Sequence, residues 1–269
     1  MVEEDGSVRR GVWWRSRVPW WRELGLAAVL YGAYDLVHGL IEGDRGTAVR
    51  NGSMLLHVER FLHLDPELWL NHTLDKVPVL AVAACFFYAT LHFVVTPAVL
   101  IWVYWKRQPH YGQVRTTLAL ITLSALIGFW LFPTAPPRLL PHAGLQDTLA
   151  MFRSWGWWGG HVGVPAAARP IENVYAAMPS LHVAWAAWCG ATIFLLARVR
   201  VVRLLAVLYP IGTAVVVMAT ANHYLLDVLA GLLLWLVAQL VVAAFTRTRG
   251  QRADGVERSA VSHAAGRSV

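Results

Sequence analysis

The sequence has few charged residues and few cysteines for its length. Asp, Glu, Lys and Arg make up 14% of the 269 residues, well below the roughly 25% of a soluble domain. Hydrophobic residues make up 57%. Both cysteines, Cys85 and Cys189, lie inside apolar runs, so we expect buried small side chains rather than a disulfide or a metal pair. This composition excludes an ordinary soluble domain and predicts an integral membrane protein.

The hydrophobic residues gather in long segments. In lipid, a segment must satisfy its own backbone hydrogen bonds, so we expect each to be a helix. The predicted fold is all-α, a polytopic membrane helix bundle of about six transmembrane helices plus short interfacial helices in the outer loops. The predicted spans are Glu23–Ile41, Val77–Trp105, Thr116–Phe132, Met178–Ala197, Val201–Ala221 and His223–Phe245.

The formal net charge of +7 comes from Lys and Arg clustered between the hydrophobic segments. This pattern marks cytoplasmic loops, so nucleic acid is not an expected partner. The clusters place both termini in the cytoplasm of a multi-pass protein of the cell membrane. We expect no cleavable signal peptide, because the first residues are polar and arginine-rich. The predicted parts are a basic N-terminus (1–22), a six-span domain (23–249) and a disordered cytoplasmic tail (250–269).

Two long loops lie on the outer side in this topology. The loop at 42–77 has apolar residues at helical spacing, which predicts one or two short helices at the membrane interface. The loop at 133–177 is rich in Pro, Gly and Trp. It fits a lid over a site and an interfacial aromatic belt equally well.

Polar motifs from distant parts of the chain fall at this same outer boundary. "FPTAPPRLLP" follows the third span, "AMPSLHVAW" opens the fourth, and "NHYLLD" opens the sixth. In the second motif, Pro179 fits the first position of a helix, so that Ser180 and the free N–H groups of the first turn form an anion site. His182 lies in that turn, where it can donate a proton to a leaving oxygen.

The third motif pairs a histidine with a carboxylate. On a helix, the spacing of His223 and Asp227 places both on one face. Asp227 then accepts a hydrogen bond from one ring nitrogen of His223 and leaves the other as a nucleophile. Arg138 offers a positive fork for phosphate oxygens. Together these residues predict a phosphoryl-transfer site.

"PSLH" followed by "HYLLDV" resembles the type 2 phosphatidic acid phosphatase (lipid phosphate phosphatase) superfamily, and most closely its inositolphosphotransferase and sphingomyelin synthase branch. The resemblance covers roughly residues 60 to 245. It implies that His223 forms a phosphohistidine, that Asp227 orients it, and that His182 is the general acid.

The sequence also departs from the superfamily pattern. Val216 and Val217 stand where the third motif usually has Ser-Arg, and Leu181 replaces the glycine of the second motif. The first motif lacks its upstream lysine. These departures fit the phosphotransferase branch and leave the phosphate-binding arginine open between Arg138 and Arg169.

The predicted function is therefore a lipid phosphatase or phosphotransferase. Its substrate would be a phospholipid or a polyprenyl or other lipid-linked phosphate, and its acceptor would be water or an alcohol. We predict no cofactor and no metal: His182, His223 and Asp227 could form a two-histidine, one-carboxylate set, but no further ligands converge. The alternative is a transporter or proton-coupled permease that uses the buried His/Asp pair. The transporter alternative predicts inverted repeats or broken helices in matching halves, and neither is visible in the sequence.

Overall fold

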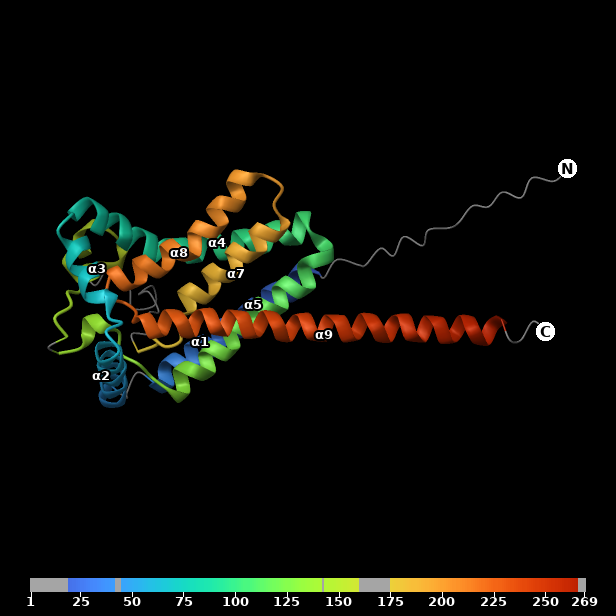
Figure 1. Ribbon diagram of the computed structural model, residues 1–269, viewed down its shortest axis with the longest axis horizontal. Helices are drawn as coiled ribbons and strands as arrows, with labels where there is room; N and C mark the ends of the chain where they lie inside the picture. The colour runs from blue at the N-terminus through green and yellow to red at the C-terminus, as the bar shows by residue number, and fades with distance from the viewer. Residues whose placement is uncertain (1–18, 42–44, 142, 160–174, 266–269) are drawn as a thin grey trace.

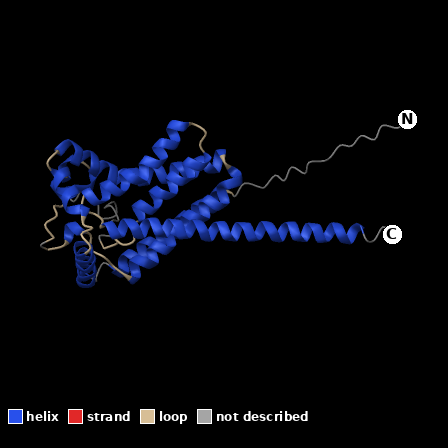
Figure 2. Cartoon of the chain, in the orientation of Figure 1, coloured by secondary structure: helices blue, strands red, loops and turns tan. Residues whose placement is uncertain are grey.

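The computed structural model describes residues 19–41, 45–141, 143–159 and 175–265. Within these ranges the chain forms helices joined by loops and contains no strand (Figure 2). The longer helices are α1 (Trp20–Ile41), α2 (Arg45–Phe61), α3 (Pro66–Asp75), α4 (Pro78–Lys106), α5 (Gln108–Leu131), α7 (Leu181–Leu196), α8 (Arg200–Ala219) and α9 (Leu225–Ala265). Between α5 and α7 lie α6 (Thr148–Met151) and the 3-10 turns η1 (Pro137–Leu139), η2 (Arg153–Trp155) and η3 (Trp157–Gly159).

The long apolar helices confirm a polytopic helical membrane protein. Among the described residues, four helices are long and apolar enough to cross a membrane, namely α4, α5, α8 and the Leu225–Thr248 part of α9. The fourth predicted span is the shorter apolar helix α7, whose 16 residues are fewer than the roughly 20 that cross a bilayer core. Helix α1 covers the first predicted span and is joined to α5 by an ion pair between Glu23 and Arg115 (2.7 Å).

Helix α7 lies at the centre of the bundle and packs against α4, α5, α8 and α9. Small residues allow the close approach, as is usual between membrane helices. A Cβ at Gly190 would collide with the carbonyl oxygen of Ala206 in α8, and one at Gly231 in α9 would collide with that of Ser180. Trp188, 1% exposed, donates its indole N–H to the carbonyl oxygen of Val114 (3.0 Å). The center of the bundle is therefore closely packed.

The loop at 42–77, which the sequence analysis placed on the outer side, contains two helices, α2 and α3, as its helical spacing predicted. Both lie at the end of the bundle where α9 begins (Figure 1). Asn71 of α3 is fully buried and donates to the carbonyl oxygen of Ala219 (2.9 Å), the last residue of α8. The predicted loop helices are thus tied directly to the link between α8 and α9.

The C-terminal segment, predicted to be a disordered tail, is drawn as a continuation of the last helix up to Ala265. Helix α9 continues through residue 250 to Ala265 and runs beyond the rest of the bundle (Figure 1). The segment after residue 250 contains Ala, Arg, Gln and Glu, which favour helix, and no proline. An established helix therefore extends through it, although Gly255 lies within it.

Candidate active site

The three polar motifs meet at one end of the bundle. The end of α5, the start of α7 and the link from α8 to α9 lie there together (Figure 1). Main-chain hydrogen bonds join the first motif to the second: Thr134 N–H donates to the carbonyl oxygen of Tyr175 (2.7 Å), and Ala177 N–H donates to that of Thr134 (3.3 Å). Ser180 N–H donates to the carbonyl oxygen of Asp227 (3.0 Å), which joins the second motif to the third.

The link between α8 and α9 is a tight turn. Ala221 has φ +55°, a left-handed conformation that is costly for a residue with a Cβ. The N–H groups of Asn222 and His223 both donate to the carbonyl oxygen of Val217 (3.0 and 3.1 Å). The turn places His223 just before α9, which begins at Leu225, and not on the helix as the sequence predicted. The pairing with Asp227 survives because Asp227 lies in the first turn of that helix.

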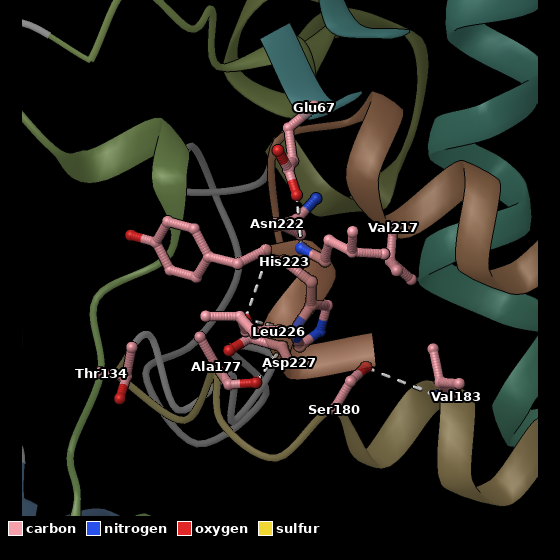
Figure 3. A network of polar contacts seen from close by, with 12 residues as sticks. Glu67, Thr134, Ala177, Ser180, Val183, Val217, Asn222, His223, Leu226 and Asp227 are labelled. Atoms are coloured by element: carbon pink, nitrogen blue, oxygen red, sulfur yellow. Dashed lines mark hydrogen bonds and ion pairs between the residues drawn. The ribbon is translucent and has the colours of Figure 1, made fainter. Parts of the chain in front are cut away.

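His223 is 3% exposed and is held through one ring nitrogen. Its Nδ1 lies 2.9 Å from the carbonyl oxygen of Ala177 and 3.3 Å from Oδ2 of Asp227 (Figure 3). A carbonyl oxygen can only accept a hydrogen bond, so Nδ1 must carry the proton. In the neutral ring, Nε2 then keeps its lone pair. The sequence assigned this orienting role to Asp227 alone, and the structure adds a shorter bond to Ala177.

Asp227 has a second contact at the start of α9. Its Oδ2 also accepts from the N–H of Tyr224 (3.0 Å), as an acidic residue at the third helical position does in a capping box. The residue is fully buried, and its Oδ1 has no hydrogen-bond partner. Asp227 therefore caps the start of α9 and also binds His223.

Ser180 caps α7 instead of following its first residue. The helix begins at Leu181, so Pro179 precedes the cap and is not the first helical residue that the sequence predicted. The Ser180 hydroxyl oxygen accepts from Val183 N–H at 3.5 Å (Figure 3). The side chain is fully buried. Its proposed role in phosphate binding stays a prediction, because its observed contact is with its own helix.

His182 lies in the first turn of α7, among aromatic rings. It stacks on Tyr88 with ring centroids 4.6 Å apart, and it lies edge to face with His92 with centroids 4.3 Å apart. Its centroid is 5.6 Å from that of His223. Two imidazoles at this distance can contact one phosphoryl group. A small cavity with room for about one water molecule lies beside His182, between α4, α7 and α8.

Arg138 reaches the same turn from η1. Its backbone N–H donates to the carbonyl oxygen of Ala221 (3.0 Å), and its Nε donates to Oδ1 of Asn222 (2.8 Å). Its Nη1 forms an ion pair with Asp147 (3.0 Å). The guanidinium therefore lies beside the residue that precedes His223. Arg169, the other predicted phosphate ligand, lies outside the described residues.

Two buried glutamates were missed by sequence reasoning. Oε1 of Glu59, in α2, accepts from Leu226 N–H (2.6 Å), and Oε1 of Glu67, in α3, accepts from Leu225 N–H. Each residue is 1% exposed. Burial raises the pKa of Glu59 to about 8 and that of Glu67 to about 7. The sequence does show acidic residues within the helical pattern of the loop at 42–77. Nothing in that pattern shows which helix these residues would contact.

The loop after α5 packs against α4 where it is described. Trp158 donates its indole N–H to the carbonyl oxygen of Leu149 (3.1 Å) and lies edge-on against Phe86 at 4.7 Å. The choice between a lid and an aromatic belt stays open, because residues 160–174 lie outside the described ranges. Within the described chain, no group of three or more His, Cys, Asp or Glu is arranged to hold a metal ion.

A family model of the PAP2 superfamily matches residues 53–241, well over half of the chain. The protein belongs to the PAP2 superfamily. This membership supports a function of the lipid phosphatase or phosphotransferase kind. The resemblance of "PSLH" and "HYLLDV" is thereby confirmed at the level of the superfamily, and the inositolphosphotransferase branch stays a prediction. Searches of curated proteins and of solved structures gave no match.

Proposed function

We propose that this protein transfers the phosphate of a membrane lipid through a phosphohistidine at His223. The observation that carries the proposal is the pair of acceptor oxygens beside Nδ1 of His223, which favours the tautomer with the lone pair on Nε2. Nε2 attacks phosphorus, an N–P bond forms and the ester P–O bond breaks. His182 protonates the departing alcohol. In the second half, water or an acceptor alcohol attacks phosphorus, His182 takes its proton, and the N–P bond breaks.

Asp227 stabilises the intermediate electrostatically. A phosphorylated imidazole that keeps its Nδ1 proton is cationic, and Asp227 lies 3.3 Å from that nitrogen. The Ala177 carbonyl contributes a second acceptor at 2.9 Å. A fixed negative charge at a buried position acts on the developing positive charge without solvent reorganisation. Positioned groups of this kind are usually the largest contribution to catalysis.

Arg138 is the proposed phosphate ligand among the described residues. The superfamily's third motif would place an arginine at position 217, and Val217 here is 1% exposed and packed in the core. Arg138 is placed beside Asn222 and so supplies a positive charge next to the histidine. Arg169 and Ser180 remain further proposed ligands. These replacements favour the inositolphosphotransferase-like branch, with a phospholipid donor and an alcohol or water as acceptor.

The direct test is to trap the intermediate. Purified protein is incubated with 32P-labelled lipid phosphate and quenched, and the adduct should be labile in acid and stable in base, as phosphohistidine is. His223→Ala should give no adduct. His57→Ala, at an exposed histidine of α2, is the matched control and should label like wild type. An adduct that persists in His223→Ala would contradict the mechanism, and labelling in neither protein would favour the transporter alternative.

The substrate can be found with the same pair of variants. Membranes that contain wild type or His223→Ala are given a panel of phospholipids and inositol lipids, and products are compared by mass spectrometry. A product that depends on His223 identifies the lipid. A free phosphate product indicates water as acceptor, whereas a new phosphodiester indicates transfer to an alcohol. On the topology predicted from the Lys and Arg clusters, this site faces the extracytoplasmic side of the cell membrane.

A further inference from the structure

The start of α9 is capped by residues from outside its own helix. The first N–H groups of a helix have no partner within it and need acceptors. Tyr224, just before the helix, has no short side-chain oxygen to accept them. Glu67 accepts from Leu225 and Glu59 accepts from Leu226. Helices α2 and α3 thus supply the cap of the helix that carries Asp227, and Glu67 of α3 is seen above the start of that helix in Figure 3.

These caps are carboxylates where a neutral acceptor would suffice. The second oxygen of each, Oε2, is buried without a hydrogen-bond partner. Leaving an ionised oxygen in that state is costly, and helices are usually capped by Ser, Thr, Asn or Asp of their own sequence. A main-chain amide can be capped by glutamine equally well. The choice of two acids therefore points to a role for their charge or their proton as well as their shape.

The charge of these acids acts close to the reacting histidine. Asp227 and Asp65 raise the pKa of both glutamates, and Glu67 also raises that of Glu59. Tyr224 is a further titratable group beside them, and Asp65 also pairs with Arg60 at 3.9 Å. Burial and these like charges keep both glutamates protonated to pH values near neutrality, since their pKa values rise to about 8 and about 7. Raising the pH adds negative charge beside the site.

We infer that Glu59 and Glu67 are positioning residues of the active site, which hold the first turn of α9 and, through it, His223. In their neutral form they hold the helix without repelling an anionic phosphate. When they ionise, the added negative charge opposes phosphate binding and separates the acids from one another. This inference rests on the proposed function of His223 and adds to it an alkaline limit set by residues of the outer helices.

The test compares glutamine and alanine at both positions. Glutamine keeps an acceptor for the amide and cannot ionise, whereas alanine removes the acceptor. Turnover of dioctanoyl phosphatidic acid and of dioctanoyl phosphatidylinositol in detergent micelles is measured from pH 5.5 to 9.5. Glu23→Gln is the matched control, because Glu23 pairs with Arg115 between α1 and α5. It should leave the pH profile unchanged.

The double variant Glu59→Gln/Glu67→Gln should keep wild-type kcat near pH 6. Its alkaline limb of kcat/KM should move up by about one pH unit, since the charge that forms near pH 7 to 8 is gone. The alanine variants should lose about tenfold in kcat at every pH, because a helix amide is left without its acceptor. If the glutamates served only the stability of the fold, the double variant would have a lower melting temperature and an unchanged alkaline limb of kcat/KM.

Three outcomes decide the matter. An unshifted limb in the double glutamine variant, with His223→Ala inactive, overturns the positioning role and leaves the proposed function intact. Full activity of His223→Ala overturns the proposed function and the inference with it. If the double variant does not fold, each single glutamine variant carries the test, with an expected shift of about half a pH unit.

Discussion

Helices α7 and α9 both begin at the site, but their first turns are held in different ways. Helix α7 is capped locally by Ser180, the residue before it. The first amides of α9 are bound by Glu59 and Glu67, more than 150 residues earlier in the chain. The histidines beside these helix ends differ too: His182 packs among aromatic rings, and His223 is fixed by polar acceptors. The proton donor thus depends on packing and the nucleophile on a network of hydrogen bonds.

The largest effect is expected from the two histidines, and it should separate their roles. His223→Ala should abolish turnover. His182→Ala should lose about 10²–10⁴-fold, the range for a general acid. With a nitrophenyl phosphate ester, whose leaving group needs no proton, His182→Ala should recover most of its activity in a spectrophotometric assay and His223→Ala should recover none. Equal recovery in both variants would contradict the assignment.

Asp227→Asn should lower kcat by less than is usual when the only group that orients a catalytic histidine is removed. The Ala177 carbonyl remains 2.9 Å from Nδ1 and still selects the tautomer. We expect kcat to fall about 10²-fold from the loss of charge, against about 10⁴-fold where the tautomer is also lost. The fold-change in kcat is measured by steady-state kinetics on the lipid found by mass spectrometry. A loss as large as 10⁴-fold would show that the carbonyl does not orient the ring.

Stability should fall as pH rises through the glutamate titrations. The pKa values of Glu59 and Glu67 rise on folding, so between about pH 4.5 and 8 the folded protein binds more protons than the unfolded protein. Their contribution is greatest below the unfolded value and is lost as the pH approaches 8. The melting temperature of wild type should therefore drop between pH 5 and 8.5, by about 2–4 °C per kcal/mol lost. Thermal unfolding in detergent should show a smaller drop for Glu59→Gln/Glu67→Gln.

The smallest effect is expected at the cap of α7. Ser180→Ala removes the acceptor of Val183 N–H and should cost about 1 kcal/mol of stability. If the cap is its only role, KM for the lipid phosphate should stay unchanged. Ser180→Thr, which keeps the hydroxyl, is the control. A raised KM in Ser180→Ala with normal KM in Ser180→Thr would show that the hydroxyl also binds phosphate.

Sequence reasoning found the features that depend on local pattern. Long apolar runs predicted the helices, and helical spacing in the outer loop predicted α2 and α3. It placed His223 on the helix and Pro179 at the first position of α7, and both were wrong by one or two residues. The link after α8 turns through Ala221, which has a left-handed conformation. The loop before α7 ends at Ser180, which caps that helix, and Pro179 lies within the loop. The start of α9 is held by acceptors from elsewhere in the chain, whereas that of α7 is held by Ser180 itself, and neither boundary follows from the apolar pattern.

By itself, the sequence determined a helical membrane bundle and the pairing of His223 with Asp227. Hydrophobicity and short-range spacing are enough for both, because they depend on solvent and on one turn of chain. Only the tertiary structure decided that Ala177 fixes the tautomer of His223 and that two glutamates cap α9. A backbone carbonyl has no signature in the sequence, and a buried acid shows its role only when the chain brings its partner to it.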